Sequence, residues 1–143
     1  MILFKKFHIK PILSGLKICT RRSGLKRWNK GSFHEAKTNY NSDSCFARLK
    51  IIGEPYREML SLMTPVSAQH EGGYTIHECK DKFLNNKMLK DVCSKCHNHN
   101  TCFQVVWVGI NGEWNPDDEP WVVYFKCLTK GNDVMPMMNT VAL

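Results

Sequence analysis

The chain has 143 residues, enough for one ordinary domain but not for two large ones. Hydrophobic residues make up 43% of it and charged residues 23%, which indicates a globular rather than a disordered protein. The formal net charge is +7, and no apolar run approaches the roughly 20 residues of a membrane-spanning helix, so we expect no stable membrane insertion.

The positive charge is concentrated at the N-terminus. Residues 1–34 hold nine of the 20 Lys and Arg side chains and no acidic residue, which leaves residues 35–143 with a formal charge of −2. A basic, acid-free segment with interspersed Ile, Leu and Phe is typical of a mitochondrial transit peptide. The sequence therefore predicts import into the mitochondrial matrix, with removal of the segment between about residue 20 and residue 45.

A retained N-terminal arm is the alternative interpretation of the same segment. If residues 1–34 stay on the protein, their charge would allow RNA to bind there. If they are removed, the acidic remainder makes general nucleic-acid binding unfavourable.

The next elements are short. Residues 35–48 are rich in Asn, Ser and Thr and are predicted to be a linker or the start of the mature protein. Cys45 to Ile52 is compatible with a strand. Gly53, Glu54 and Pro55 are typical of a helix start, and apolar residues follow at helical spacing until Pro65, which we expect to end the segment.

The second half is predicted to change from helix to strand. Tyr74–His77 is interpreted as a strand and Lys80–Lys90 as a helix. Phe103–Ile110 and Trp121–Cys127 are rich in aromatic and β-branched residues, and Asn111–Gly112 between them favours a hairpin. We therefore expect one small α+β domain over residues 49–130, with N-terminal helices, a C-terminal antiparallel β-hairpin and a tail at 131–143.

A cysteine and histidine cluster is the main candidate site. Cys93 and Cys96 form a C-x-x-C pair, a spacing that lets two thiolates bind one zinc ion. We predict a structural zinc site formed by Cys93, Cys96, His99 and Cys127. The fourth ligand stays open, and the alternative ligands are Cys102, His97, His77 and Cys79. Reduced, packed cysteines without a metal are the competing interpretation.

The same pair also fits a haem attachment motif. Cys93 to His97 is C-x-x-C-H, in which the cysteines would form thioethers to haem c and His97 would be the proximal ligand. Met135, Met137 or Met138 would then supply the distal ligand. A c-type haem protein for electron transfer is therefore an alternative function.

Several short motifs between residues 93 and 127 occur together in one known family. They are Cys93-x-x-Cys96, Gln104–Val105, Asp118–Glu119–Pro120 and Phe125-x-Cys127. In this respect the segment resembles the zinc ribbon of transcription elongation factor TFIIS and of related small RNA polymerase subunits. The resemblance implies a zinc-ribbon hairpin, and it implies that Asp118 and Glu119 would enter a polymerase active site and promote RNA cleavage.

No other catalytic pattern stands out, because the sequence has no Gly-rich phosphate loop, nucleophile elbow or H-E-x-x-H motif. An enzyme is therefore not favoured. The predicted function is that of a mitochondrial, metal-stapled component of a larger protein assembly, such as a ribosome or a respiratory complex. A polymerase-associated zinc-ribbon factor is the second alternative.

Overall fold

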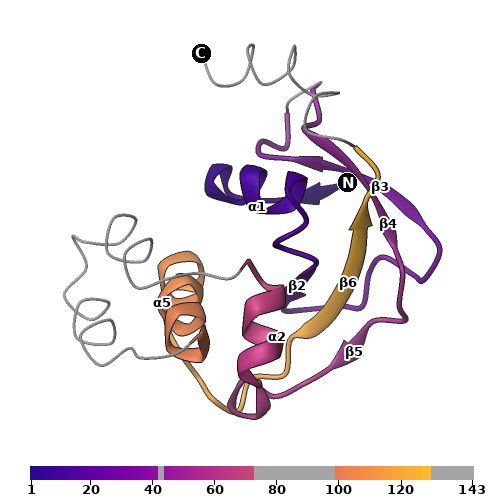
Figure 1. The fold of residues 1–143 in the computed structure, drawn as a ribbon. Helices are drawn as coiled ribbons and strands as arrows, with labels where there is room; N and C mark the ends of the chain where they lie inside the picture. The colour runs from indigo at the N-terminus through magenta and orange to yellow at the C-terminus, as the bar shows by residue number, and fades with distance from the viewer. Residues whose placement is uncertain (42–43, 73–98, 130–143) are drawn as a thin grey trace.

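The computed structural model of the protein describes residues 1–41, 44–72 and 99–129, which form a mixed α+β fold (Figure 1). This confirms the predicted α+β class. The strands are β1 (Ile2–Leu3), β2 (Cys19–Arg22), β3 (Phe33–Lys37), β4 (Ala47–Ile51), β5 (Tyr56–Arg57) and β6 (Trp121–Cys127). The helices are η1 (Lys6–His8), α1 (Ile9–Leu13), η2 (Leu60–Leu62), α2 (Pro65–His70) and α5 (His99–Asn111).

The strands form one curled sheet with the order β1-β3-β4-β6-β2, and β5 also pairs with β6. Only β1 and β3 run parallel among the described strand pairs. Strand β6 pairs with β2 through Tyr124 and Cys19, and with β4 through Phe125 and Ile51. The curl brings the two end strands of this order, β1 and β2, close to each other. Arg22 of β2 donates a hydrogen bond to the carbonyl of Leu3 in β1 at 2.6 Å.

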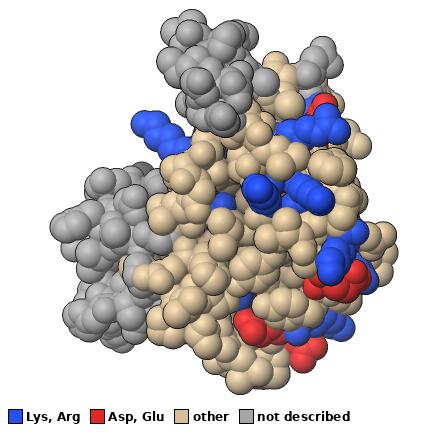
Figure 2. All heavy atoms as spheres, turned by 45° about the vertical axis from the view of Figure 1, so that its right-hand side comes forward, with Lys and Arg blue, Asp and Glu red and all other residues tan. Residues whose placement is uncertain are grey.

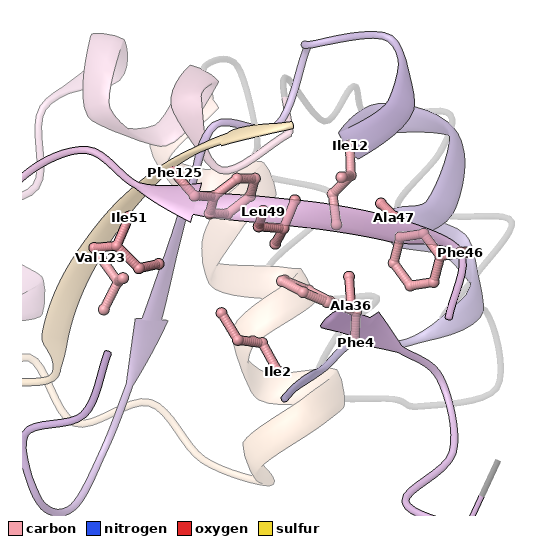
Figure 3. Close-up of a cluster of buried hydrophobic side chains, with 10 residues drawn as sticks. All are labelled: Ile2, Phe4, Ile12, Ala36, Phe46, Ala47, Leu49, Ile51, Val123 and Phe125. Carbon is pink, nitrogen blue, oxygen red and sulfur yellow. The ribbon is translucent and has the colours of Figure 1, made fainter. Parts of the chain in front are cut away.

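The main core lies on one face of this sheet (Figure 3). Strand β4 shows why: its apolar residues alternate with charged ones, so Leu49 and Ile51 are fully buried while Arg48 and Lys50 are exposed. The buried members of the core are Ile2, Phe4, Ile12, Ala36, Phe46, Ala47, Leu49, Ile51, Val123 and Phe125. Strand β6 and the strand expected within Cys45–Ile52 were therefore predicted correctly.

Residues 1–34 are part of this fold. They supply β1, α1 and β2, and Ile2 and Ile12 are fully buried in the core. The residues expected to form a linker, 35–48, include the end of β3 and the start of β4. Matrix import stays a prediction, but removal of residues 1–34 would take β1, η1, α1, β2 and the start of β3 out of this structure.

The strand predicted over Phe103–Ile110 is wrong. These residues belong to the 13-residue helix α5, which is followed by Gly112 at φ 90° with its N–H bonded to the carbonyl of Val108 at 2.8 Å. The Asn111–Gly112 pair therefore ends a helix, where Gly readily adopts a positive φ, instead of turning a hairpin. Consequently the predicted zinc-ribbon-type hairpin between this segment and β6 is not formed.

The helix predicted from Gly53 to Pro65 is also wrong. The segment contains β5 and η2, and Pro65 begins helix α2 instead of ending one. The Thr64 side chain caps α2 by accepting a hydrogen bond from the Ser67 N–H at 3.1 Å. Thr followed by Pro is a favourable start for a helix, because Pro at the first position has no N–H to satisfy.

Helices α2 and α5 pack together over a second apolar cluster. Leu60, Met63 and Ala68 contact Phe103 and Trp107 there, with Trp114 at its margin. No helix in the described ranges is long and apolar enough to cross a membrane. The predicted strand Tyr74–His77, the predicted helix Lys80–Lys90 and the tail 131–143 lie outside the described residues.

Candidate functional site

A pocket of about 330 Å³ is lined by residues of the two end strands of the sheet, β1 and β2, and of helix α5. Residues 3–5 and His8 line one side of it, residues 20–23 of β2 and the following turn line another, and α5 contributes Phe103, Val106 and Trp107. Ligand pockets of proteins are usually concave and partly apolar, with a few convergent polar groups and volumes of roughly 300–1,000 Å³. This pocket is therefore the candidate site.

Lys17 lies at the base of the pocket and is only 2% exposed. Its ammonium group donates to three acceptors: the Cys19 carbonyl at 2.8 Å, the Glu71 carbonyl at 3.0 Å and Glu71 Oε2 at 2.9 Å. An ammonium group has three protons, so this geometry satisfies all of its donors. Because Lys17 and Glu71 are 54 positions apart, their pair connects the start of β2 to the end of α2.

Arg21 on β2 completes this buried ion cluster. Its Nη1 lies 3.0 Å from Glu71 Oε1, and its Nη2 lies 3.0 Å from Glu58 Oε1 and 2.5 Å from the Ser67 hydroxyl. Its Nε is buried and has no hydrogen-bond partner within the described part of the chain. A buried N–H without a partner costs about 1–3 kcal/mol, so this atom is an unfavourable feature that the surrounding ion pairs must offset.

Burial and the Glu71 carboxylate together shift the pKa values of two groups in the cluster, Arg21 and Cys19. Burial disfavours a charged guanidinium, but the Glu71 carboxylate and neighbouring groups outweigh it and raise the pKa of Arg21 above its usual value. Burial, reinforced by Glu71, raises the pKa of the nearby Cys19 thiol well above its usual range. Cys19 is therefore held as a neutral thiol and is a poor nucleophile.

Arg22 and Lys5 are the two cations of the pocket wall that form no ion pair with a carboxylate of the described residues. Of the two, Arg22 is held by defined contacts. Its Nη2 donates to the Leu3 carbonyl at 2.6 Å, its Nε donates to the Thr20 hydroxyl at 3.2 Å, and its guanidinium lies 5.1 Å from the Phe4 ring centroid. No carboxylate of the described residues lies within ion-pair distance of it. Burial lowers the pKa of Arg22, although the charge of Glu71 acts in the opposite direction. A bound anion would stabilise the charged form further.

The rest of the wall is aromatic. Phe103 and Trp107 of α5 lie with their ring centroids 5.9 Å apart and their planes tilted by 42°. Phe4 contacts the ring of His8 edge-on at 6.0 Å on the β1 side of the pocket. The site therefore combines an apolar wall of largely buried aromatic rings, each at most 6% exposed, with guanidinium groups beside them.

The predicted metal ligands are placed very differently. Cys93, Cys96, His97, His77 and Cys79 lie outside the described residues, as do Met135, Met137 and Met138. His99 begins α5, and Cys102 is buried on the same helix. Cys127 ends β6, where its thiol donates to the Thr129 carbonyl at 3.2 Å and burial raises its pKa.

No three His, Cys, Asp or Glu side chains within the described ranges are grouped so that they could hold a metal ion. The zinc site and the haem alternative therefore stay predictions that depend on the segment outside these ranges.

The acidic pair Asp118 and Glu119 lies in the turn before β6. The Asp118 carbonyl accepts a hydrogen bond from the Leu60 N–H at 2.9 Å, which joins this turn to η2. The Glu119 carboxylate lies 3.6 Å from Arg57 on β5. Both residues thus connect the turn to neighbouring elements, and neither lines the pocket.

Sequence reasoning missed Lys17, Thr20, Arg21, Arg22 and Glu71. The first four belong to the basic segment interpreted as a transit peptide: three lie in β2, and Lys17 lies two positions before that strand. A usable signal was present, because a short β-strand pattern, Cys19–Arg22, carries two arginines that would need partners if the strand were covered on both faces.

Comparison of the chain with protein-family models, with curated proteins and with solved structures gave no match. The site is therefore interpreted from its own geometry.

Proposed function

We propose that this protein binds a nucleotide, either free or as part of a single-stranded RNA, in the pocket between β1, β2 and α5. The observation that carries the proposal is the Arg22 guanidinium, which lines the pocket beside the Phe4 ring and has no acidic partner in the described chain. This function also uses the basic N-terminal segment as a retained part of the fold.

The charge of the pocket favours an anion. Its lining contains Lys5, Lys17, Arg21 and Arg22 but one carboxylate, that of Glu71. Glu71 and Glu58 already neutralise Lys17 and Arg21. The charges of Lys5 and Arg22 are thus left for a ligand, and a guanidinium with several N–H donors suits a phosphate group.

The aromatic walls favour a planar group next to that phosphate. Proteins hold unpaired bases against aromatic rings and arginine planes, and side chains of both kinds line this pocket, although Phe4, Phe103 and Trp107 are each at most 6% exposed. A volume of about 330 Å³ suits a ligand of about one nucleotide, so a longer strand would place a single residue here.

The test is to titrate the full chain with the four ribonucleoside monophosphates, with inorganic phosphate and with a short oligouridine, using calorimetry. We expect at least one nucleotide to bind more tightly than phosphate. Arg22→Gln should weaken its binding about 10- to 150-fold, because a charge-assisted hydrogen bond contributes about 1.5–3 kcal/mol. Tighter binding of the oligouridine would identify the strand as the source of the nucleotide.

The matched control is Arg57→Gln. Arg57 is exposed on β5, lies outside the pocket and pairs with Glu119, so its loss removes the same charge without touching the site. Thermal unfolding should show that both variants fold. Absence of binding by all four nucleotides, or equal affinity of Arg22→Gln and the unsubstituted protein, would overturn the proposal.

A further inference from the structure

The face of the sheet opposite the main core carries an unusual group of side chains. Strand alternation turns Leu49 and Ile51 of β4 into the core and leaves Arg48 and Lys50 exposed on the other side. The neighbouring strands add Phe33 from β3 and Lys126 from β6, both exposed as well. These four residues are called the sheet-face patch below, and none of them lines the pocket.

Strand register arranges the patch as a row. Phe33 is the partner of Lys50, and Lys50 is the partner of Lys126, so the three side chains cross β3, β4 and β6 side by side. Adjacent strands are about 4.8 Å apart, which gives the row a length of about 10 Å. Arg48 lies two residues from Lys50 on the same face of β4.

Phe33 is 51% exposed, although large apolar side chains on an open sheet promote aggregation. Two cations flank it: Arg48 Cζ and Lys50 Nζ each lie 5.6 Å from the centroid of its ring. The patch therefore presents an aromatic ring beside two positive charges of β4, with half of that side chain exposed.

In the described part of the chain, the patch has one carboxylate beside it, that of Glu35, which is the register partner of Arg48. Glu35, the acidic residue of β3 on this face, has its carboxylate 3.5 Å from Lys37. Arg48, Lys50 and Lys126 take part in no ion pair among the described residues. The patch thus holds three positive charges that form no ion pair among the described residues, two of them next to the exposed ring.

We infer that the sheet-face patch binds single-stranded nucleic acid, with a base stacked on Phe33 and backbone phosphates on Arg48, Lys50 and Lys126. Strand-binding proteins combine these two features, a positive track for the backbone and aromatic rings for successive bases. A membrane surface would instead require a broad apolar face, and this patch is built around one ring between cations. The inference depends on observations separate from those at the pocket.

The experiment measures binding of a fluorescent oligouridine and of the corresponding oligodeoxythymidine to the full chain over a series of salt concentrations. Phe33→Ala should weaken binding about 5- to 150-fold, the range expected for one stacked base. The double variant Arg48→Gln/Lys50→Gln should also reduce the slope of log K against log salt by about 1.4, since each single-strand phosphate contact contributes about 0.7.

The matched control is Lys6→Gln/Lys10→Gln, which removes two exposed positive charges from η1 and α1. Helix α1 packs against the opposite, core face of the sheet through Ile9 and Leu13. Binding and salt slope should change little in this control. An equal loss in both double variants, or retention of full affinity by Phe33→Ala, would overturn the inference.

The pocket and the patch are distinguishable in the same assay. The patch variants should bind mononucleotides as the unsubstituted protein does. Arg22→Gln should weaken mononucleotide binding as stated above and keep the salt slope contributed by the patch. Binding of the chain to phosphatidylserine vesicles, with no binding to either oligonucleotide, would overturn the inference in favour of a membrane surface.

Discussion

Strands β2 and β4 both pair antiparallel with β6, yet they bury opposite kinds of side chain. Strand β4 turns Leu49 and Ile51 inward and its charged residues outward. Strand β2 is covered more completely, and its Arg21 is 6% exposed. A buried apolar residue needs only close packing, whereas a buried charge needs acceptors at the right distance, here Glu71 and Glu58.

This difference between β2 and β4 shows why the burial of a charged residue is hard to predict from sequence. Glu71 lies 50 positions from Arg21, and Glu58 lies 37 positions away. The local sequence around Lys17 and Arg21 contains nothing that indicates these partners. From composition alone, the basic segment is therefore interpreted as a solvated or targeting sequence. Three experiments test whether β2 is held by ionic partners and β4 by packing.

The largest effect is expected from deletion of residues 1–34. The deletion removes β1, α1 and β2, empties the core of Ile2 and Ile12, and leaves Glu71 buried without Lys17 and Arg21. We expect residues 35–143 to show no cooperative thermal unfolding by circular dichroism, in contrast to the full chain. A cooperative transition in the shortened protein would mean that the strand order described here is not essential, and it would favour a cleaved N-terminus.

The second effect is expected from Glu71→Gln. Removing one partner of a buried ion pair leaves uncompensated charge, which costs about 3–5 kcal/mol of the free energy of unfolding. Urea denaturation measures this change. The matched control is Glu119→Gln, whose carboxylate forms an exposed pair with Arg57 and should change stability by less than about 0.5 kcal/mol.

A double-mutant cycle sharpens this second test. Because Arg21 and Glu71 are in contact, the combined loss in Arg21→Met/Glu71→Gln should differ from the sum of the single losses by about 0.5–3 kcal/mol. Simple additivity would show that β2 does not depend on this pair.

The smallest effect is expected from Arg48→Gln on β4. Arg48 points away from the core, so its replacement should change the free energy of unfolding by at most about 0.5 kcal/mol in urea. Leu49→Ala, one position away, should cost about 2–5 kcal/mol because it creates a cavity in the core. Similar costs for these two neighbours would contradict the assigned alternation.

Helix α5 was predicted as a strand for a different reason. Cys102, Phe103 and Val105 to Val108 are all buried, so the helix is apolar around much of its circumference and lacks a clear 3.6-residue period. A continuous apolar run rich in β-branched residues fits a buried strand equally well. Packing against α2 and the pocket decides the outcome, and Gly112 then serves as a helix end.

The candidate site was largely beyond prediction for a related reason. Strand β6 was predicted with its correct bounds because alternation and composition agree there. The pocket depends on the curl that brings Arg22 to the Leu3 carbonyl and on the return of the chain from α2 to Lys17. Neither of these long-range contacts can be recognised from the spacing of residues along the sequence.

The sequence by itself determined the α+β class, the strands within Cys45–Ile52 and Trp121–Cys127, and the concentration of positive charge at the N-terminus. These features depend on side-chain periodicity and composition, which act over a few residues. Figure 2 shows how the fold then distributes the basic side chains over one face, with most of the acidic side chains of that view gathered in its lower part. Only the tertiary structure decided which of these charges are buried, because the partners that stabilise Lys17 and Arg21 come from positions more than 35 residues away.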